Sequence, residues 1–129
     1  MPTNWIGFLA TMRVIKHINR WGIFTQVINI TDDGCGTASV DIYDDNPTVA
    51  LVHSISVIKS KRQQGYGNRL LKACEDYAKK RKKVTSIELW ADTKSVAYDW
   101  YKRKGYTPTM EFNVLSDDVF LNKLVKVIK

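Results

Sequence analysis

The chain has 129 residues, 44% of them hydrophobic and 26% charged, and its 20 Lys and Arg against 13 Asp and Glu give a formal net charge of +7. This length and composition exclude a disordered chain and predict a single domain over residues 1–129 with one hydrophobic core. No apolar run approaches the roughly 20 residues of a membrane-spanning helix, so we expect no membrane partner, and the positive charge suggests an anionic one.

The first segment, residues 1–11, contains a short apolar stretch that no basic residue precedes, so it does not have the pattern of a secretion signal. We expect it to remain in the mature protein as a short helix or an ordered arm. Cys35 and Cys74 are isolated, and with His17 and His53 they make a poor zinc ligand set. We therefore expect reduced cysteines, no metal and a cytoplasmic location.

Residues 22–58 have the composition of three β-strands. Gly22–Ile30 is rich in β-branched and aromatic residues and is followed by turn-forming residues, and Thr37–Tyr43 alternates as its antiparallel partner would. A second turn then leads to Val49–Ile58 as the third strand. Strict alternation along this third strand places His53 and Val57 on the same face.

After residue 58 the apolar residues recur at helical spacing. Tyr66–Lys82 predicts an amphipathic helix, Val84–Ala91 a strand, and Ser95–Lys104 a short helix that a glycine ends. Tyr106–Leu115 and Val119–Val127 predict a closing hairpin. The order of these elements predicts a mixed α/β fold of α+β-like character, a mostly antiparallel sheet with helices packed on its faces.

The positive charge is concentrated in residues 59–83. Ten basic and two acidic residues give this segment +8, whereas ten basic and eleven acidic residues give the rest of the chain −1. The cluster from Lys79 to Lys83 lies at the end of the expected helix, so it is either a solvated helix end, where cations complement the helix dipole, or part of an anion-binding surface. The bases before the helix stand beside two glycines and need another explanation.

These two glycines, Gly65 and Gly67, lie where the third strand passes into the first long helix. Glycine lets a ligand approach the backbone closely, and the unpaired amides of a first helical turn can hold a phosphate. The loop lacks the third glycine of a dinucleotide-binding fingerprint and the Gly-Lys-Ser/Thr ending of a triphosphatase loop. It is therefore either a phosphate-binding loop of another kind or simply a tight strand-to-helix turn.

A second segment favours the first reading. Together with the loop pattern on Val57 and Arg62 to Gly67, the spacing of Ala97, Tyr101, Gly105 and Tyr106 resembles the GNAT superfamily of N-acetyltransferases. The resemblance covers about residues 48–127 and agrees with the topology predicted from periodicity. It implies a GNAT-type sheet flanked by helices, here with a shortened N-terminal helical region.

The resemblance also implies an acyltransferase that uses acetyl-CoA as co-substrate and a small-molecule or peptide amine as acceptor. The loop amides would bind the pyrophosphate, the end of the preceding strand would bind the pantetheine arm, and the amide of Val57 would polarise the thioester carbonyl. The residues assigned to the cofactor in this way are Ile55, Ser56, Val57, Arg62, Gln63, Gln64, Gly65, Tyr66, Gly67, Asn68, Lys94, Ala97 and Tyr101.

Tyr101 matches the tyrosine that protonates the departing CoA thiolate, with a core aromatic as the alternative. Lys94 replaces the family's usual Asn, so that contact with the cofactor is either remade by the ammonium or lost. Some members carry a carboxylate that acts as general base at the position of Leu89. Glu88 is one residue away and should face the other side of the sheet. The candidate general base is His53. The alternatives are that His53 is a core histidine with no catalytic role, or that a water relay carries the proton to bulk solvent.

The chain has only about twenty residues before Gly22–Ile30, where family members usually carry two helices that shape the acceptor pocket. The acceptor site is then open, completed by a second copy in a homodimer, or degraded. Two alternatives to catalysis remain: a non-catalytic acyl-CoA-binding module of the same fold, and a nucleic-acid binder that uses the basic helix. The basic helix lacks interleaved aromatics, so we expect no nucleic-acid partner.

Overall fold

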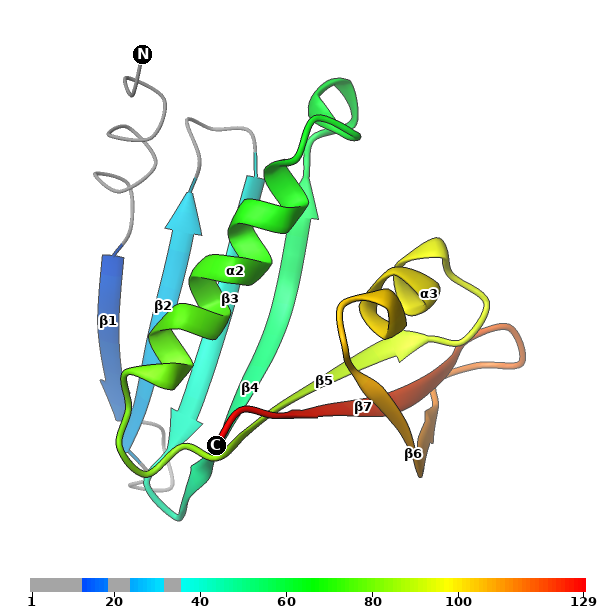
Figure 1. Ribbon diagram of the computed structural model, residues 1–129. Coiled ribbons are helices and arrows are strands. Elements are labelled where there is room, and N and C mark those ends of the chain that lie inside the picture. Colours follow the sequence, from blue (N-terminus) through cyan, green and yellow to red (C-terminus); the bar gives the residue numbers. More distant parts are fainter. Residues whose placement is uncertain (1–12, 19–23, 32–35) are drawn as a thin grey trace.

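The computed structural model describes residues 13–18, 24–31 and 36–129 (Figure 1). Within them the strands form one seven-stranded sheet in the order β1-β2-β3-β4-β5-β7-β6. The strands are β1 (Arg13–Ile18), β2 (Phe24–Thr31), β3 (Gly36–Tyr43), β4 (Asn46–Val57), β5 (Ser86–Asp92), β6 (Thr107–Val114) and β7 (Phe120–Val127). The helical segments are a 3₁₀ turn, η1 (Lys59–Lys61), and the α-helices α2 (Tyr66–Lys79) and α3 (Val96–Arg103).

The predicted order of elements from β2 onward is confirmed, as is the mixed, mostly antiparallel sheet. The strand β1 was not predicted; it pairs antiparallel with β2, and only residues 19–23 separate the two strands. The arm or helix expected over residues 1–11 lies outside the described residues. The predicted pairing of the last two strands is also confirmed, although β7 rather than β6 lies next to β5.

The prediction that the long helix extends to Lys82 is wrong, because α2 ends at Lys79. The amide of Lys80 still donates to carbonyls of the last turn, but the amide of Arg81 donates to Ala78 and that of Val84 donates to Arg81, in tight turns. These turns carry Val84 into the core, where it is almost fully buried. Burial of this one apolar side chain thus determines where the basic helix stops.

The sheet opens between β4 and β5. These two strands are parallel and pair only through Val49, Ala50 and Leu51 of β4, after which they separate (Figure 1). Every other neighbouring pair of strands in the described sheet is antiparallel. The second half of β4 therefore has β3 on one side and an unpaired edge on the other.

A β-bulge lies in β4 just beyond this opening. Thr37 pairs with Ser56 and Ser39 with His53, so three residues of β4 span the distance that two residues of β3 span. A bulge bends its strand and reverses the alternation of side chains beyond it. The prediction that His53 shares a face with Val57 is therefore wrong: His53 lies on the face of Ser56, opposite Val57.

The two described helices, α2 and α3, pack on the same face of the sheet. The core between them includes Val40, Val52, Leu70, Leu89 and Leu124, each at most 2% exposed. On this face α2 covers β2, β3 and β4, while α3 lies beside β5 and β7 (Figure 1). The opposite face of the sheet carries the side chains that project away from this core.

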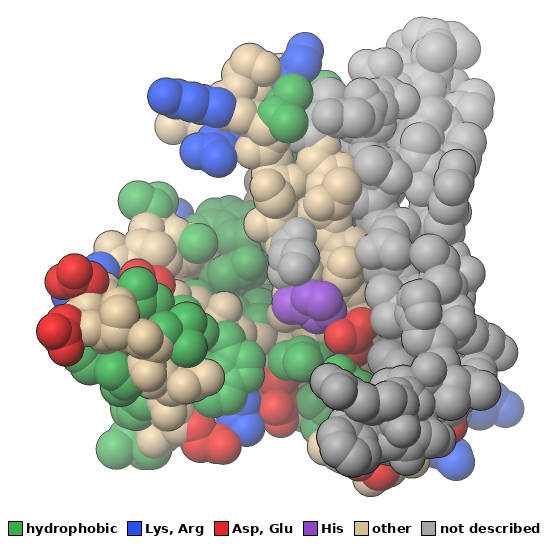
Figure 2. Space-filling model, turned by 180° about the vertical axis from the view of Figure 1, so that it is seen from behind, with side chains coloured by type: hydrophobic (Ala, Val, Ile, Leu, Met, Phe, Trp, Pro, Cys, Tyr) green, Lys and Arg blue, Asp and Glu red, His purple; other side chains and the backbone are tan. Residues whose placement is uncertain are grey.

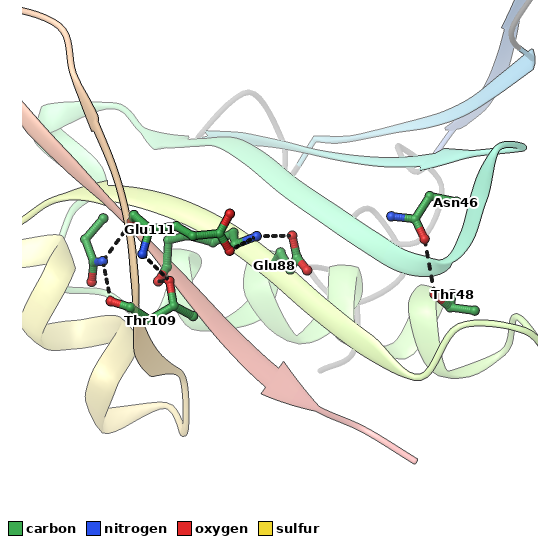
Figure 3. A network of polar contacts seen from close by, with 7 residues as sticks. Asn46, Thr48, Glu88, Thr109 and Glu111 are labelled. Carbon is green, nitrogen blue, oxygen red and sulfur yellow. Dashed lines mark hydrogen bonds and ion pairs between the residues drawn. The ribbon is translucent and has the colours of Figure 1, made fainter.

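On that opposite face, Lys123 of β7 bridges the carboxylates of Glu88 on β5 and Glu111 on β6 (Figure 3). Hydrogen bonding to Glu111 is the main reason that the pKa of Lys123 is raised. The side-chain amide of Asn122 donates to the carbonyls of Thr109 and Glu111, where β6 departs from regular pairing. These contacts hold β5, β7 and β6 together as one half of the sheet.

None of the helices in the described ranges is long and apolar enough to cross a membrane.

Gly36 at the start of β3 lets this strand approach the end of β4. A Cβ at this position would lie 2.6 Å from the carbonyl oxygen of Ser56 and 2.9 Å from a methyl group of Leu70. We expect Gly36→Ala to lower the free energy of unfolding by about 1–3 kcal/mol, because a backbone atom has to move. Urea denaturation measures this, with Thr37→Ser at the exposed neighbouring position as control; equal stability of the two variants would contradict the close approach.

Candidate functional site

A cleft of about 270 Å³ lies where β4 and β5 separate. Its walls come from three elements: β4, β5 and the start of α3. The lining residues are Leu51, Val52, His53, Ile55, Leu89, Trp90, Ala91, Asp92, Ser95, Ala97 and Tyr101. Figure 2 shows the molecule from the face opposite α2, where the histidine lies beside an acidic side chain and near apolar ones. Cationic side chains gather at the upper end of this view.

The glycine loop enters α2 through left-handed backbone. Gln63 has φ of 63° and Gly65, the N-cap of α2, has φ of 88°. The amide of Arg69 donates to the carbonyl of Gly65, which closes the first turn of the helix. No side chain caps this end, and no acidic residue lies in its first turn. The backbone amides of the first turn are thus directed outward, at the positive end of the helix dipole.

One hydrogen bond ties the loop to the end of β4, and another lies within the loop. Nε of Arg62 donates to the carbonyl of Val57 over 3.0 Å, and Nε2 of Gln64 donates to the carbonyl of Ser60 over 3.2 Å. A Cβ on Gly67 would lie 3.7 Å from the ring of Trp100 on α3. The loop therefore joins the end of β4 to the first turn of α2 beside α3, and a methyl group on Gly67 would make ordinary van der Waals contact with Trp100.

Of the three tyrosines near α3, the structure distinguishes Tyr101. The hydroxyl of Tyr98 donates to Oδ1 of Asn122, and that of Tyr106 donates to Oε2 of Glu75, each over 2.8 Å. Tyr101 lines the cleft instead. Burial, followed by the neighbouring Cys74, raises the pKa of Tyr101 above its usual value. Its phenol therefore stays protonated at neutral pH and can act as a proton donor.

His53 is not a core histidine. Its side chain is 42% exposed, and its Nε2 lies 2.8 Å from Oδ2 of Asp41, whose side chain is only 13% exposed. The two residues lie on adjacent strands, on the face opposite α2. The bulge in β4 is what brings an imidazole to the mouth of the cleft while Val57 packs against the core.

The remaining predicted residues fall into two groups. Ile55 and Ala97 line the cleft, whereas Ser56 is exposed beside it. Lys94 does not line the cleft: its ammonium lies 5.5 Å from the ring centre of Phe120. The two carboxylate positions considered for a base are unsuitable, since Leu89 is buried and Glu88 is paired with Lys123.

Sequence reasoning missed Asp41 as a partner of His53 and did not assign Trp90 or Asp92 to the site. Asp41 could not be paired with His53 from the sequence, because the register of β3 on β4 was unknown. Trp90 and Asp92 lie on the strand that precedes α3, and both line the cleft. Their place at the carboxyl end of β5 was the one signal that could have identified them.

In the described part of the chain, no group of three or more His, Cys, Asp or Glu residues could hold a metal ion. Cys74 is a free thiol, and burial, followed by Glu75, raises its pKa to about 12. Such a thiol is a poor nucleophile at neutral pH. Cys35 lies outside the described residues.

A family model described as an acetyltransferase (GNAT) domain matches residues 20–108. No curated protein matches the chain. Among solved structures, Ard1 from Thermoplasma volcanium has a TM-score of 0.65 at 20% identity, and covers 81% of this chain and 70% of its own. An acyl-CoA N-acyltransferase from Pseudomonas aeruginosa has a TM-score of 0.62 at 19% identity, with 79% and 68% covered.

A GNAT family acetyltransferase from Elizabethkingia anophelis, solved with acetyl-CoA bound, has a TM-score of 0.61 at 12% identity. The match covers 92% of this chain and 99% of that one. At these identities the structures establish a shared fold, while the family model supplies the match in sequence.

The raised pKa of Tyr101 can be measured directly. We expect the difference between the ultraviolet pH titrations of the wild type and Tyr101→Phe to have its midpoint above pH 10, because burial disfavours the phenolate. Far-UV circular dichroism at each pH is the control for unfolding. A midpoint at or below pH 10 would show that this phenol is solvated.

Proposed function

Because the chain belongs to the GNAT acetyltransferase family, we propose that it transfers the acetyl group of acetyl-CoA to the primary amine of a small molecule or a peptide. The observation that carries this proposal is the uncapped first turn of α2 next to a cleft that Tyr101 lines. One end of this arrangement suits a pyrophosphate, and the other suits acid–base chemistry on a thioester.

The cofactor site in this proposal follows the loop and the free edge of β4. Amides from Gln63 to Asn68 bind the pyrophosphate, and Arg62 stands next to them with its Nε on the carbonyl of Val57. Beyond Leu51 the edge of β4 that faces β5 has no strand partner. Its backbone groups are available to the amide groups of the pantetheine arm along Ile55, Ser56 and Val57.

In the proposed reaction, an unprotonated amine attacks the thioester carbon directly. The amide of Val57 donates to the carbonyl oxygen as negative charge develops there. The carbon–sulfur bond breaks, and Tyr101 gives its proton to the departing thiolate. His53 accepts the proton that the attacking nitrogen loses, and exchange with solvent returns both side chains to their starting states.

The acceptor in this proposal reaches the cleft from the face opposite α2, on which His53 lies. The five residues 19–23 between β1 and β2 are too few for the two helices that family members usually carry in this place. An acceptor site without these two helices would take a peptide or a small amine, either alone or completed by a second copy in a homodimer.

Binding of acetyl-CoA should stabilise the folded protein. At a ligand concentration 100-fold above the dissociation constant, we expect about 2.7 kcal/mol of added stability, seen as a rise of several degrees in the melting temperature. Gly67→Glu should abolish the shift, because a carboxylate there repels the pyrophosphate and meets the Trp100 ring. Gly67→Ala, whose methyl group fits, is the matched control. Absence of any shift at millimolar acetyl-CoA would overturn the proposal.

Tyr101→Phe separates binding from catalysis. We expect this variant to keep the acetyl-CoA stabilisation and to lose about 10²–10⁴-fold in turnover, the usual contribution of a general acid. A coupled thiol-release assay over a panel of polyamines, amino acids, aminoglycosides and peptides measures this. Unchanged turnover would remove Tyr101 from the mechanism. Stabilisation by acetyl-CoA without turnover of any amine by the wild type would instead favour a non-catalytic acyl-CoA-binding module.

A further inference from the structure

We propose that Asp41 is a positioning residue for His53, which it holds in a single tautomer at the mouth of the cleft. This inference rests on the proposed function, in which His53 is the general base. The two residues come from different strands and are brought together by the register of β3 on β4, in which Asp41 is opposite Leu51 and Ser39 is opposite His53.

The geometry of the pair is that of an oriented base. Oδ2 of Asp41 accepts the hydrogen bond from Nε2 of His53 over 2.8 Å. With the proton on Nε2, the basic lone pair of the neutral ring is on Nδ1. A carboxylate on the far nitrogen also stabilises the imidazolium that forms when Nδ1 takes a proton, without itself becoming protonated.

The Asp41 carboxylate is largely buried and can therefore hold the His53 ring in one orientation. The carboxylate is 13% exposed, and its second oxygen, Oδ1, is buried with no hydrogen-bond partner among the described residues. A carboxylate with so little solvation depends on the hydrogen-bond donors beside it, and the Nε2–H of His53 is one of them. After burial, the charge of Asp41 and its side-chain hydrogen bond with Tyr43 raise the pKa of Tyr43 on the same strand.

Other titratable groups face the same cleft. Asp92 of β5 and Tyr101 of α3 line it, whereas Glu88 of β5 is held by Lys123. Asp41 contacts the imidazole directly, through the hydrogen bond with Nε2. The alternative is that the two residues form only a cross-strand contact on a partly exposed surface. Such a contact would contribute little to stability and nothing to turnover.

The test compares Asp41→Asn with the wild type in kcat and KM. The asparagine amide can no longer stabilise imidazolium, so we expect kcat to fall by at least about 10-fold and by no more than the 10²–10⁴-fold that a general base contributes. Asp41→Glu should restore part of the activity. Adding Asp41→Asn to His53→Gln should cost little more than His53→Gln alone, because both act through one proton transfer.

Asp76→Asn is the matched control, because it removes an acidic partner from an exposed ion pair with Lys72 on α2, away from the cleft. It should leave kcat and KM unchanged. If Asp41→Asn also leaves them unchanged while the wild type is active, the inference fails and the proposed function stands. If the wild type neither binds acetyl-CoA nor acetylates any amine, the proposed function itself fails.

The inference can also be tested on the wild type, without any variant that could fail to fold. Nitrogen-15 chemical shifts of the His53 ring at neutral pH identify the protonated nitrogen. We expect the Nε2–H tautomer to predominate. A predominant Nδ1–H tautomer would overturn the inference.

Discussion

The short pairing of β4 with β5 is the constraint on which the site depends. Three residues, Val49 to Leu51, join the two halves of the sheet before the strands separate. If the pairing continued, β4 would have no free edge and the cleft between the strands would close. The contacts of Lys123 with Glu88 and Glu111 keep the β5-β7-β6 half intact, so the opening is confined to one seam. A stable sheet and an accessible backbone edge thus coexist in the same fold.

The bulge in β4 gives the two walls of this opening different chemistry. The bulge reverses the alternation of side chains along β4. Val57 therefore faces the core, and His53 lies on the opposite face, where it contacts Asp41 of β3. Without the extra residue, one of these two side chains would be on the wrong side of the sheet. The face that α2 and α3 cover therefore carries the phenol of Tyr101, and the opposite face carries the imidazole, so in the proposed reaction acid and base act from opposite sides of one thioester.

Local patterns in the sequence were enough to predict the strands from β2 onward, both helices and the glycine loop, because each depends on residues close together in the chain. The end of α2 was misplaced because helical periodicity continues through the lysines, while burial of Val84 ends the helix. The face of His53 and its pairing with Asp41 depend on a bulge and on register, which are set by contacts between strands. Alternation along one strand carries no information about either.

The basic residues lie at both ends of α2, and the two groups have different explanations. At about 1.5 Å per residue, the 14 residues of α2 span roughly 21 Å, so the cluster from Lys79 to Lys83 lies at the far end of the helix from the loop. Cations at that end are favoured by the dipole and need no ligand. Lys59, Lys61 and Arg62 stand near the opposite, positive end, where the dipole disfavours them and no acidic residue of the first turn compensates. An anion bound at the first turn of α2 would offset that repulsion, so the proposed pyrophosphate site accounts for the loop cations rather than for the larger cluster.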